Sequence, residues 1–460
     1  MFKKVLTLFL VSVLVFSCVG CGKKSGLPEY ESKQFDLSGL WFTNELSEAT
    51  MQLYKDVGFT TFSCSNHSLE KTSENQYYLG SERTMKALEL CRKLGLNAAI
   101  SYGDWIALWS EGEGYYTETP FSQFDIYGDY KDIIVSVGIV DEPSVEHFEI
   151  YGNKTLIEDF KKVYPNADYS YNLIPITAMS SRGFNDYGEM MKLVEETFME
   201  PFEKPCISVD VYPFHEGMTA DDGTMALNYN YIAESAKKYN IKPAYILQAS
   251  LGNEFEKSLS ESDLRWEIYN ALAFGADKLE YYCYSVPQTF NEDGTVDYMY
   301  DSCILKQDDT PSDIYYSLQK LHKEIQSFAS VILSYDWDKT IGVSGTEDQT
   351  FRVASLEYDF DASEYIKLDG SKNYVDASGT QDMLVSRFKS EKYGEAYMFL
   401  NWADRDASNT ISAEFKDCSS IAVYGGVGFD GTPEIIKLDE NGKTTIELEY
   451  GEGVFVVPLA

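Results

Sequence analysis

Two adjacent acidic residues follow directly on an apolar run. The segment Val135 to Val140 is apolar and mostly β-branched, which predicts a buried strand, and Asp141-Glu142-Pro143 comes immediately after it. Carboxylates are unfavourable in an apolar setting unless they have a counter-charge, hydrogen bonds or a chemical role. A carboxyl group at the rim of an apolar core has a raised pKa, which suits a general acid. The acid pair is therefore the first candidate for chemistry in this chain.

Three further acids accompany other apolar runs. Asp210 interrupts "CISVDVYPF", in which Tyr212 has the same parity and so points the same way. Glu280 lies in "KLEYYCYS", and Asp104 ends "NAAISYGD". Each is a candidate partner for Glu142. We favour Asp210 because it breaks an otherwise apolar strand.

Apolar runs of this kind recur eight times, and a helical stretch follows each of them. Eight β-then-α units in about 290 residues are what a (β/α)₈ barrel requires. The active sites of such barrels lie at the carboxyl ends of the strands, so the acids above would meet at one mouth. The eight runs are "LSGLWFTN", "FTTFSCS", "NAAISYGD", "IIVSVGIVDE", "DYSYNLIP", "CISVDVYPF", "AYILQAS" and "KLEYYCYS".

The segments between the runs carry helix signals. Three of the predicted helices open at a serine and end just before a glycine, which is typical of βαβ units. They span Ser47 to Asp56, Ser81 to Leu94 and Ser262 to Phe274. A further helix from about Pro311 to Ala329 closes the barrel. The segment "MSSRGFNDYGEM" lacks helical periodicity and predicts a functional loop.

The character of the chain changes after this last helix. In "TIELEY", Ile446, Leu448 and Tyr450 alternate with acids, which predicts a strand with one buried face. Asn441-Gly442 is a hairpin signal. The sequence therefore predicts an α/β fold with two domains, a (β/α)₈ TIM barrel over residues 36–335 and an antiparallel β-sandwich over 340–460.

Composition excludes several classes of function. The chain has 460 residues and a formal net charge of −36, so nucleic acid is an implausible partner because phosphate binding needs clustered Lys and Arg. Six cysteines after residue 21 are scattered without CxxC spacing, and the four histidines form no metal-binding pair. We therefore expect no metal and no cofactor.

The N-terminus is a targeting segment. Lys3 and Lys4 precede an apolar run, Val5 to Phe16, which is too short to span a bilayer as a stable helix. The following "SCVGCGKKSG" resembles a bacterial lipoprotein signal over residues 1–21, which implies lipidation at Cys21, with Cys18 as the alternative site. The resemblance implies a lipid anchor in the bacterial membrane and a location at the cell surface. An ordinary secretory signal is the other reading.

A second resemblance rests on the acid pair and the architecture. A Glu at the end of strand four is the acid/base position in the clan of (β/α)₈ glycoside hydrolases that includes β-galactosidases and cellulases. The motif there is usually Asn-Glu, and here it is Asp141-Glu142-Pro143. The resemblance covers residues 36–460. It implies hydrolysis of an oligosaccharide or polysaccharide, with Glu142 as general acid, Asp141 orienting it and Asp210 as the second carboxylate.

One position departs from the pattern of that clan. Its nucleophilic Glu ends strand seven, where this chain carries Gln248, an amide that cannot act as a carboxylate nucleophile. Strands four and six are not neighbours, which favours the wider carboxyl spacing of inverting enzymes, about 6.5–9.5 Å.

The residues at the strand ends match the surfaces of a sugar. Aromatic planes fit the apolar C–H faces and amides fit the hydroxyl edges. The predicted substrate contacts are Trp41, Asn44, Tyr102, Trp105, Asn172, Tyr212, Gln248, Glu280 and Tyr282.

Two functions remain open at this point. The intact pair Asp141-Glu142 favours a glycoside hydrolase. Gln248 favours a non-catalytic carbohydrate-binding lipoprotein on the same barrel scaffold.

Overall fold

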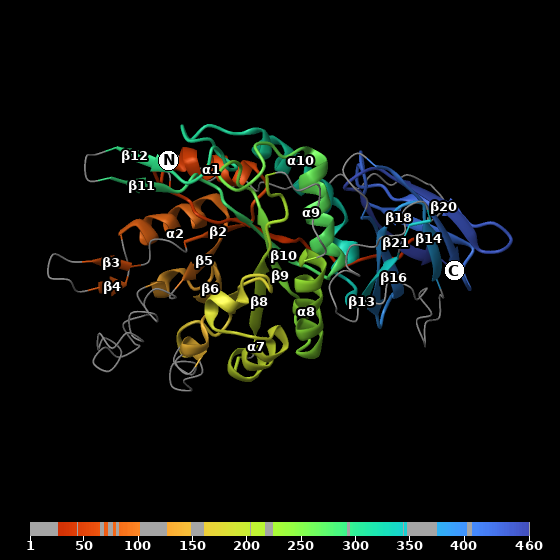
Figure 1. The fold of residues 1–460 in the computed structure, drawn as a ribbon, viewed down its shortest axis with the longest axis horizontal. Helices are drawn as coiled ribbons and strands as arrows, with labels where there is room; N and C mark the ends of the chain where they lie inside the picture. Colours follow the sequence, from red (N-terminus) through yellow and green to blue (C-terminus); the bar gives the residue numbers. More distant parts are fainter. Residues whose placement is uncertain are drawn as a thin grey trace, which may run out of the picture.

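The computed structural model describes residues 26–43, 45–64, 69–71, 77–79, 82–101, 127–148, 161–202, 204–216, 224–291, 295–343, 345–346, 375–402 and 407–459. These residues form a parallel barrel followed by two antiparallel sheets, so the predicted TIM barrel with a β-sandwich behind it is confirmed (Figure 1).

Eight parallel strands form the barrel in the order β1-β10-β9-β8-β7-β6-β5-β2. All eight predicted runs contribute a strand. The strands are β1 (Asp36–Gly39), β2 (Thr61–Ser63), β5 (Asn97–Ser101), β6 (Ile134–Asp141), β7 (Asp168–Leu173), β8 (Pro205–Asp210), β9 (Ala244–Gln248) and β10 (Lys278–Tyr282). Strand β1 lies nearer the N-terminus than predicted. It ends at Gly39 because the backbone then turns away and becomes left-handed at Trp41, with φ of 65°.

The barrel is nearly closed where β1 and β2 approach each other, and side chains add hydrogen bonds there. The backbone amide of Thr60 donates to the carbonyl of Leu37 at 2.9 Å, and the Thr60 hydroxyl accepts from the amide of Leu37 at 2.9 Å. The buried Tyr54 hydroxyl accepts from the amide of Gly39 at 2.7 Å and lies 2.9 Å from the carbonyl of Thr61. A tyrosine from the first helix thus supplies hydrogen bonds between β1 and β2, the two end strands of the sheet, which form no ladder with each other among the described residues.

Helices cover the outside of the barrel. They are α1 (Glu48–Asp56), α2 (Glu82–Leu94), α7 (Tyr187–Val194), α8 (Thr224–Lys238), α9 (Glu261–Ala273) and α10 (Asp313–Ile332), with short turns η2 (Val145–His147), η3 (Met179–Arg182) and η4 (Glu195–Met199). Helix α1 has the predicted Ser47 cap. Helix α9 starts earlier than predicted: Ser260 caps it, in a capping box with Asp263.

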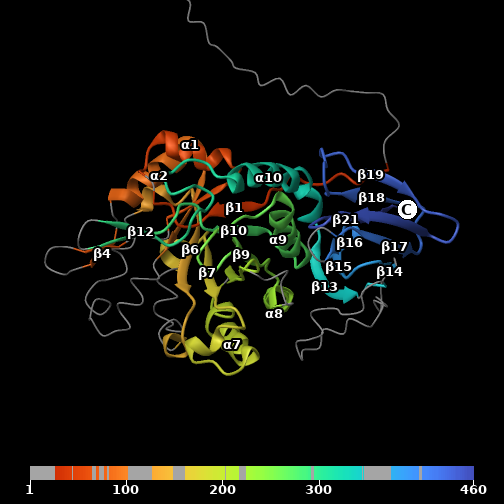
Figure 2. The ribbon, with the colours of Figure 1, turned by 45° about the horizontal axis from the view of Figure 1, so that its top comes forward.

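Two short hairpins extend from the barrel loops. They are β3 (Leu69–Lys71) with β4 (Tyr77–Leu79) after β2, and β11 (Gln288–Phe290) with β12 (Val296–Tyr298) after β10. Both views place these hairpins on the side of the barrel away from the C-terminal sheets (Figures 1 and 2).

The C-terminal part is a sandwich of two antiparallel sheets with its own apolar core. The larger sheet has the order β13-β15-β16-β21-β18-β19 and the smaller β14-β17-β20. The strands are β13 (Asp336–Val343), β14 (Val375–Gly379), β15 (Met383–Ser390), β16 (Gly394–Asn401), β17 (Asn409–Phe415), β18 (Ser420–Tyr424), β19 (Glu434–Lys437), β20 (Lys443–Leu448) and β21 (Gly453–Leu459). The turn at Asn441-Gly442 forms, but β19 and β20 pair with strands of different sheets, so the hairpin prediction is wrong.

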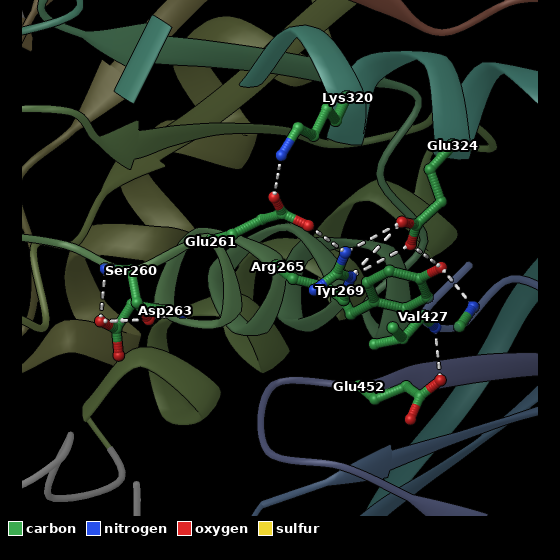
Figure 3. Close-up of polar contacts among 10 residues, drawn as sticks. Ser260, Glu261, Asp263, Arg265, Tyr269, Lys320, Glu324, Val427 and Glu452 are labelled. Carbon is green, nitrogen blue, oxygen red and sulfur yellow. Dashed lines mark hydrogen bonds and ion pairs between the residues drawn. The ribbon is translucent and has the colours of Figure 1, made fainter. Parts of the chain in front are cut away.

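A buried polar cluster joins the sandwich to the barrel (Figure 3). Arg265 of α9 pairs with Glu324 of α10 at 3.2 Å, and their side chains are only 4% and 8% exposed. The Tyr269 hydroxyl donates to Glu324 at 2.9 Å and accepts from the amide of Gly426 in the sandwich at 3.0 Å. Helix α9 also packs on β15 and β16. The sandwich is therefore bound to the outer wall of the barrel by directed hydrogen bonds as well as by apolar contact.

Candidate active site

One amide links the carboxylates of strands four and six of the barrel. The Asn172 side chain, at the end of β7, donates to Asp141 Oδ1 at 2.9 Å and to Asp210 Oδ1 at 3.0 Å. The Ser208 hydroxyl donates to Asn172 Oδ1 at 3.1 Å, which fixes the orientation of the amide. Two oxygens that share one donor nitrogen lie no more than about 6 Å apart. The sequence placed these acids at one mouth, and the structure brings them together around Asn172.

Glu142 has a different partner. Its carboxylate forms an ion pair with Arg182 from η3, the turn that follows β7. Its backbone amide donates to the carbonyl of Asn172 at 2.9 Å. The Asp141 carboxylate bonds to Asn172, so the group that holds the Glu142 carboxylate in place is Arg182 and not Asp141.

The backbone at Glu142 is unusual. Six non-glycine residues in the described part of the chain have positive φ, and four of them are Asn or Asp, which tolerate it. The other two are Trp41, with φ of 65°, and Glu142, with φ of 45°. A bulky residue in this region costs roughly 1–2 kcal/mol, and such strain clusters at functional sites. The sequence predicted both residues to belong to the site, Glu142 from its strand end and the resemblance to barrel glycosidases, and Trp41 as an aromatic residue at the rim.

Burial and like charges change the acidity of this cluster. Asp210 is 8% exposed, and desolvation, with the nearby charges of Glu142 and Asp141, raises its pKa to about 7. The hydrogen bond from Asn172 opposes that rise. The pKa of Asp141 is also raised, mainly because the surrounding wall desolvates it, although part of the residue reaches solvent. Asp210 therefore holds a proton in the neutral range, where an ordinary aspartate does not.

The acids open into a cavity of about 520 Å³. This volume falls within the range of small-molecule sites, about 300–1,000 Å³. The cavity is lined by Glu142, Ile174, Pro175, Thr177, Ala178, Ser181, Arg182, Asp210, Val211, Tyr212, Pro213, His215 and Thr224.

A row of aromatic rings continues from the acid cluster. Tyr212, two residues after Asp210, stacks on Tyr282 with ring centroids 5.7 Å apart and planes at 25°. Trp41 meets Tyr282 edge-on at 6.2 Å. Three of the predicted sugar contacts thus form one aromatic surface across β8, β10 and the end of β1.

Glu280 points into the barrel interior, below the mouth. It is 8% exposed, lies 3.3 Å from the Lys278 ammonium group and accepts from the Ser38 hydroxyl at 3.2 Å. Burial alone would lower the pKa of Lys278, but the Glu280 carboxylate, with Cys206 and Asp36 also near, raises it well above its ordinary value. Glu280 is therefore one half of a buried ion pair, and its predicted contact with substrate has no support from this position.

Gln248 is fully buried. Its Oε1 accepts from the amide of Phe214 at 2.9 Å, and its Nε2 donates to the carbonyls of Phe214 and Ser250 at 3.2 and 3.3 Å. Its own backbone amide donates to Glu267, a buried acid whose pKa is raised by desolvation. The Gln248 amide fastens the loop after β8 and exposes no surface to a ligand, so we leave it out of the proposed site.

Several predictions lie outside the described residues. They concern Asn44, Tyr102, Trp105, Asp104 and the lipidation site Cys21, with its alternative Cys18. In the parts of the chain that the structure describes, no group of three or more His, Cys, Asp or Glu could hold a metal ion. No helix among the described residues is long and apolar enough to cross a membrane.

The sequence interpretation did not name Arg182. The residue lies in "MSSRGFNDYGEM", the segment predicted as a functional loop, part of which folds as η3 and the start of α7. Gly183, with φ of 84°, ends η3 directly after it. The sequence signal for Arg182 was its position as a single arginine in a predicted loop that follows a barrel strand.

Comparison with known proteins supports the fold. No protein-family model matches the chain, and no curated protein is significantly similar to it. A family 5 glycoside hydrolase from Bacteroides vulgatus superposes with a TM-score of 0.55 at 13% identity, covering 92% of this chain and 89% of that one. A family 39 glycoside hydrolase from Bacteroides cellulosilyticus gives a TM-score of 0.49 at 13% identity, with coverage of 94% and 83%. The chain therefore shares the fold of glycoside hydrolases, and at this identity the likeness shows the fold alone.

Proposed function

We propose that this protein is a glycoside hydrolase that cleaves an oligosaccharide or polysaccharide with Asp210 and Glu142. The observation that carries the proposal is that Glu142 and the buried Asp210 line one cavity at the barrel mouth, where burial raises the pKa of Asp210 to about 7. Pairs of carboxyl groups whose environments separate their acidities are the usual signature of acid and base roles. The adjacent surface of Trp41, Tyr212 and Tyr282 provides faces for sugar rings.

The environments of the two acids suggest how the roles divide. Asp210 is desolvated and holds its proton near neutral pH, which suits the general acid that protonates the leaving oxygen. Glu142 has the Arg182 guanidinium as counter-charge, which suits the carboxylate that activates water or attacks the sugar. This division reverses the roles expected from the sequence, where Glu142 was the acid.

Hydrolysis assays on two kinds of substrate separate these roles. A general acid contributes about 10²–10⁴-fold in rate. Asp210→Asn should lose activity in that range on glycans with poor leaving groups and much less on activated aryl glycosides. Glu142→Gln should be severely impaired on both. The exposed Glu146, in the turn after the same strand, provides the control variant Glu146→Gln. If Glu142→Gln alone shows the leaving-group dependence, the roles are those expected from the sequence.

A second function is favoured by Gln248. With a buried amide at the strand-seven position, the barrel lacks the carboxylate that its structural class uses there. The alternative is a carbohydrate-binding protein that keeps the barrel and the aromatic surface. Glycan binding with no turnover, unchanged in both Asp210→Asn and Glu142→Gln, would select this alternative.

We also propose that the protein is anchored at the bacterial cell surface through a lipid on Cys21. The support is the basic start, the short apolar run and the cysteine in the first 24 residues. Palmitate labelling should disappear in Cys21→Ser. Label that persists there and vanishes in Cys18→Ser would move the site to Cys18.

A further inference from the structure

Two buried cysteines lie in contact at the barrel mouth. Cys283 directly follows β10, and Cys303 comes 20 residues later. Both are 0% exposed, and their sulfur atoms are 3.1 Å apart. A disulfide has an S–S distance of about 2.05 Å, so a shift of roughly 1 Å between the sulfurs would allow the bond. We propose that Cys283 and Cys303 form a disulfide when the chain folds under oxidising conditions.

The backbone around the pair favours this bond. The amide of Ile304 donates to the carbonyl of Cys283 at 3.3 Å, and the amide of Leu305 donates to the carbonyl of Tyr284 at 2.8 Å. The two cysteine segments are therefore held side by side before any covalent link exists. Between them the chain makes an excursion that carries the β11–β12 hairpin (Figure 1). The disulfide would close the base of this excursion.

The pair also belongs to a small apolar cluster at the candidate site. The cluster contains Phe255, Val286 and Tyr300 besides the two cysteines, and Trp41, Tyr212 and Tyr282 pack against it. A bond between the two sulfurs would therefore fix the layer of side chains beneath the aromatic surface.

The chemistry requires an external oxidant, which we take to be a small-molecule or protein disulfide. One cysteine thiolate attacks the oxidant, forms a mixed disulfide and releases one thiol. The second cysteine thiolate then attacks the cysteine sulfur of that mixed disulfide and releases the second thiol. The two cysteines lose two protons and two electrons, and the oxidant is reduced to two thiols. Because neither sulfur is exposed and burial raises the pKa of Cys283, exchange is slow in the folded protein, so the bond forms during folding.

Peptide mapping tests the proposal directly. The full chain is refolded in a mixture of reduced and oxidised glutathione, denatured, alkylated and digested without reduction. We expect the peptides of Cys283 and Cys303 to appear as one linked species that separates after reduction. The same species should appear in Cys206→Ala, which removes another buried cysteine. Alkylation of Cys283 and Cys303 as two separate free thiols would overturn the proposal.

Thermal unfolding provides a second readout that does not depend on the peptides. Loss of a cross-link that closes a loop of this size should lower Tm by roughly 3–5 °C. Prior unfolding with reductant should lower the Tm of the unmodified chain and leave that of Cys283→Ala unchanged. Cys303→Ala and the double variant should match Cys283→Ala, because either change removes the whole bond. Additive effects of the two substitutions, with no effect of reductant, would indicate two packed thiols and refute the bond.

Discussion

Replacing Asp210 with asparagine should stabilise the protein above neutral pH. In the folded chain the pKa of Asp210 is raised from 3.8 to about 7, chiefly by desolvation and then by the charges of Glu142 and Asp141. In the unfolded chain the carboxyl group has its ordinary pKa. Between these two values the folded state retains a proton that the unfolded state releases, so the free energy of unfolding falls as pH rises.

The size of the effect follows from the shift. Each pKa unit corresponds to 1.36 kcal/mol, so a shift of about three units gives at most roughly 4 kcal/mol above pH 7 and nothing below about pH 4. Asparagine is neutral at every pH and resembles the protonated acid in shape. Its carbonyl oxygen can still accept from Asn172, as Asp210 does. Asp210→Asn should therefore have nearly the stability of the unmodified chain at acidic pH and exceed it by up to about 4 kcal/mol at alkaline pH.

Urea unfolding at a series of pH values measures this difference. The exposed Asp417 has positive φ, which asparagine tolerates, so Asp417→Asn is a control at a solvent-facing aspartate and should show a flat difference. A difference between Asp210→Asn and the unmodified chain that does not change from about pH 4 to pH 8 would refute the reasoning. So would a variant that is less stable at alkaline pH, because the carboxylate would then be well solvated or paired. Stabilisation together with loss of hydrolysis would identify Asp210 as a residue kept for function at a cost in stability.

Three further predictions concern other parts of the molecule. Glu324→Ala leaves Arg265 buried without its main partner and should lower the free energy of unfolding by about 3–5 kcal/mol in denaturant unfolding. Glu261→Gln removes the more exposed partner of the same arginine and should cost less than about 1 kcal/mol. Equal costs would contradict the burial argument. Arg182→Gln should lower the rate of hydrolysis, because it removes the group that holds the Glu142 carboxylate in place, and an unchanged rate would show that Arg182 acts otherwise. The Glu142 carboxylate pairs with Arg182 and not with the Asn172 amide that binds Asp210, so we expect the wider carboxyl spacing and inversion, and a first-formed product of retained anomeric configuration by proton NMR would contradict this.

The strands of the barrel could be predicted because two independent signals agree along the chain. Apolar runs predict the strands, and the caps and glycines between them predict the helices. An error in the boundary of one element therefore does not shift the predicted positions of the others. The first strand shows the limit. Its apolar run continues past Gly39, but the left-handed backbone at Trp41 ends the strand, and no residue type there announces it. Helix α9 shows the same limit, because Ser260 and Ser262 are both plausible caps and only the bond to Asp263 decides between them.

The membership of the site was harder to predict than its position. Alternation along a strand predicts that a side chain points inward, but it does not give the depth at which the side chain lies. Glu280 and Tyr282 have the same parity on β10, yet Glu280 is buried against Lys278 and Tyr282 reaches the mouth. Arg182 posed the opposite problem. It lies 40 residues from Glu142, in a segment without a repeating pattern, and only the folded barrel brings the two together.

Gln248 bears most directly on the choice between enzyme and binding protein. A carboxylate at this position would have to replace an amide that donates to two backbone carbonyls, those of Phe214 and Ser250, and would place its charge against both oxygens. The present path of the loop after β8 therefore depends on an amide at position 248. That loop also carries Tyr212, which lines the cavity beside Asp210. The same hydrogen bonds that keep the strand-seven side chain out of the cavity thus hold the Asp210 side of the mouth in place, and the catalysis we propose relies on the acids of strands four and six.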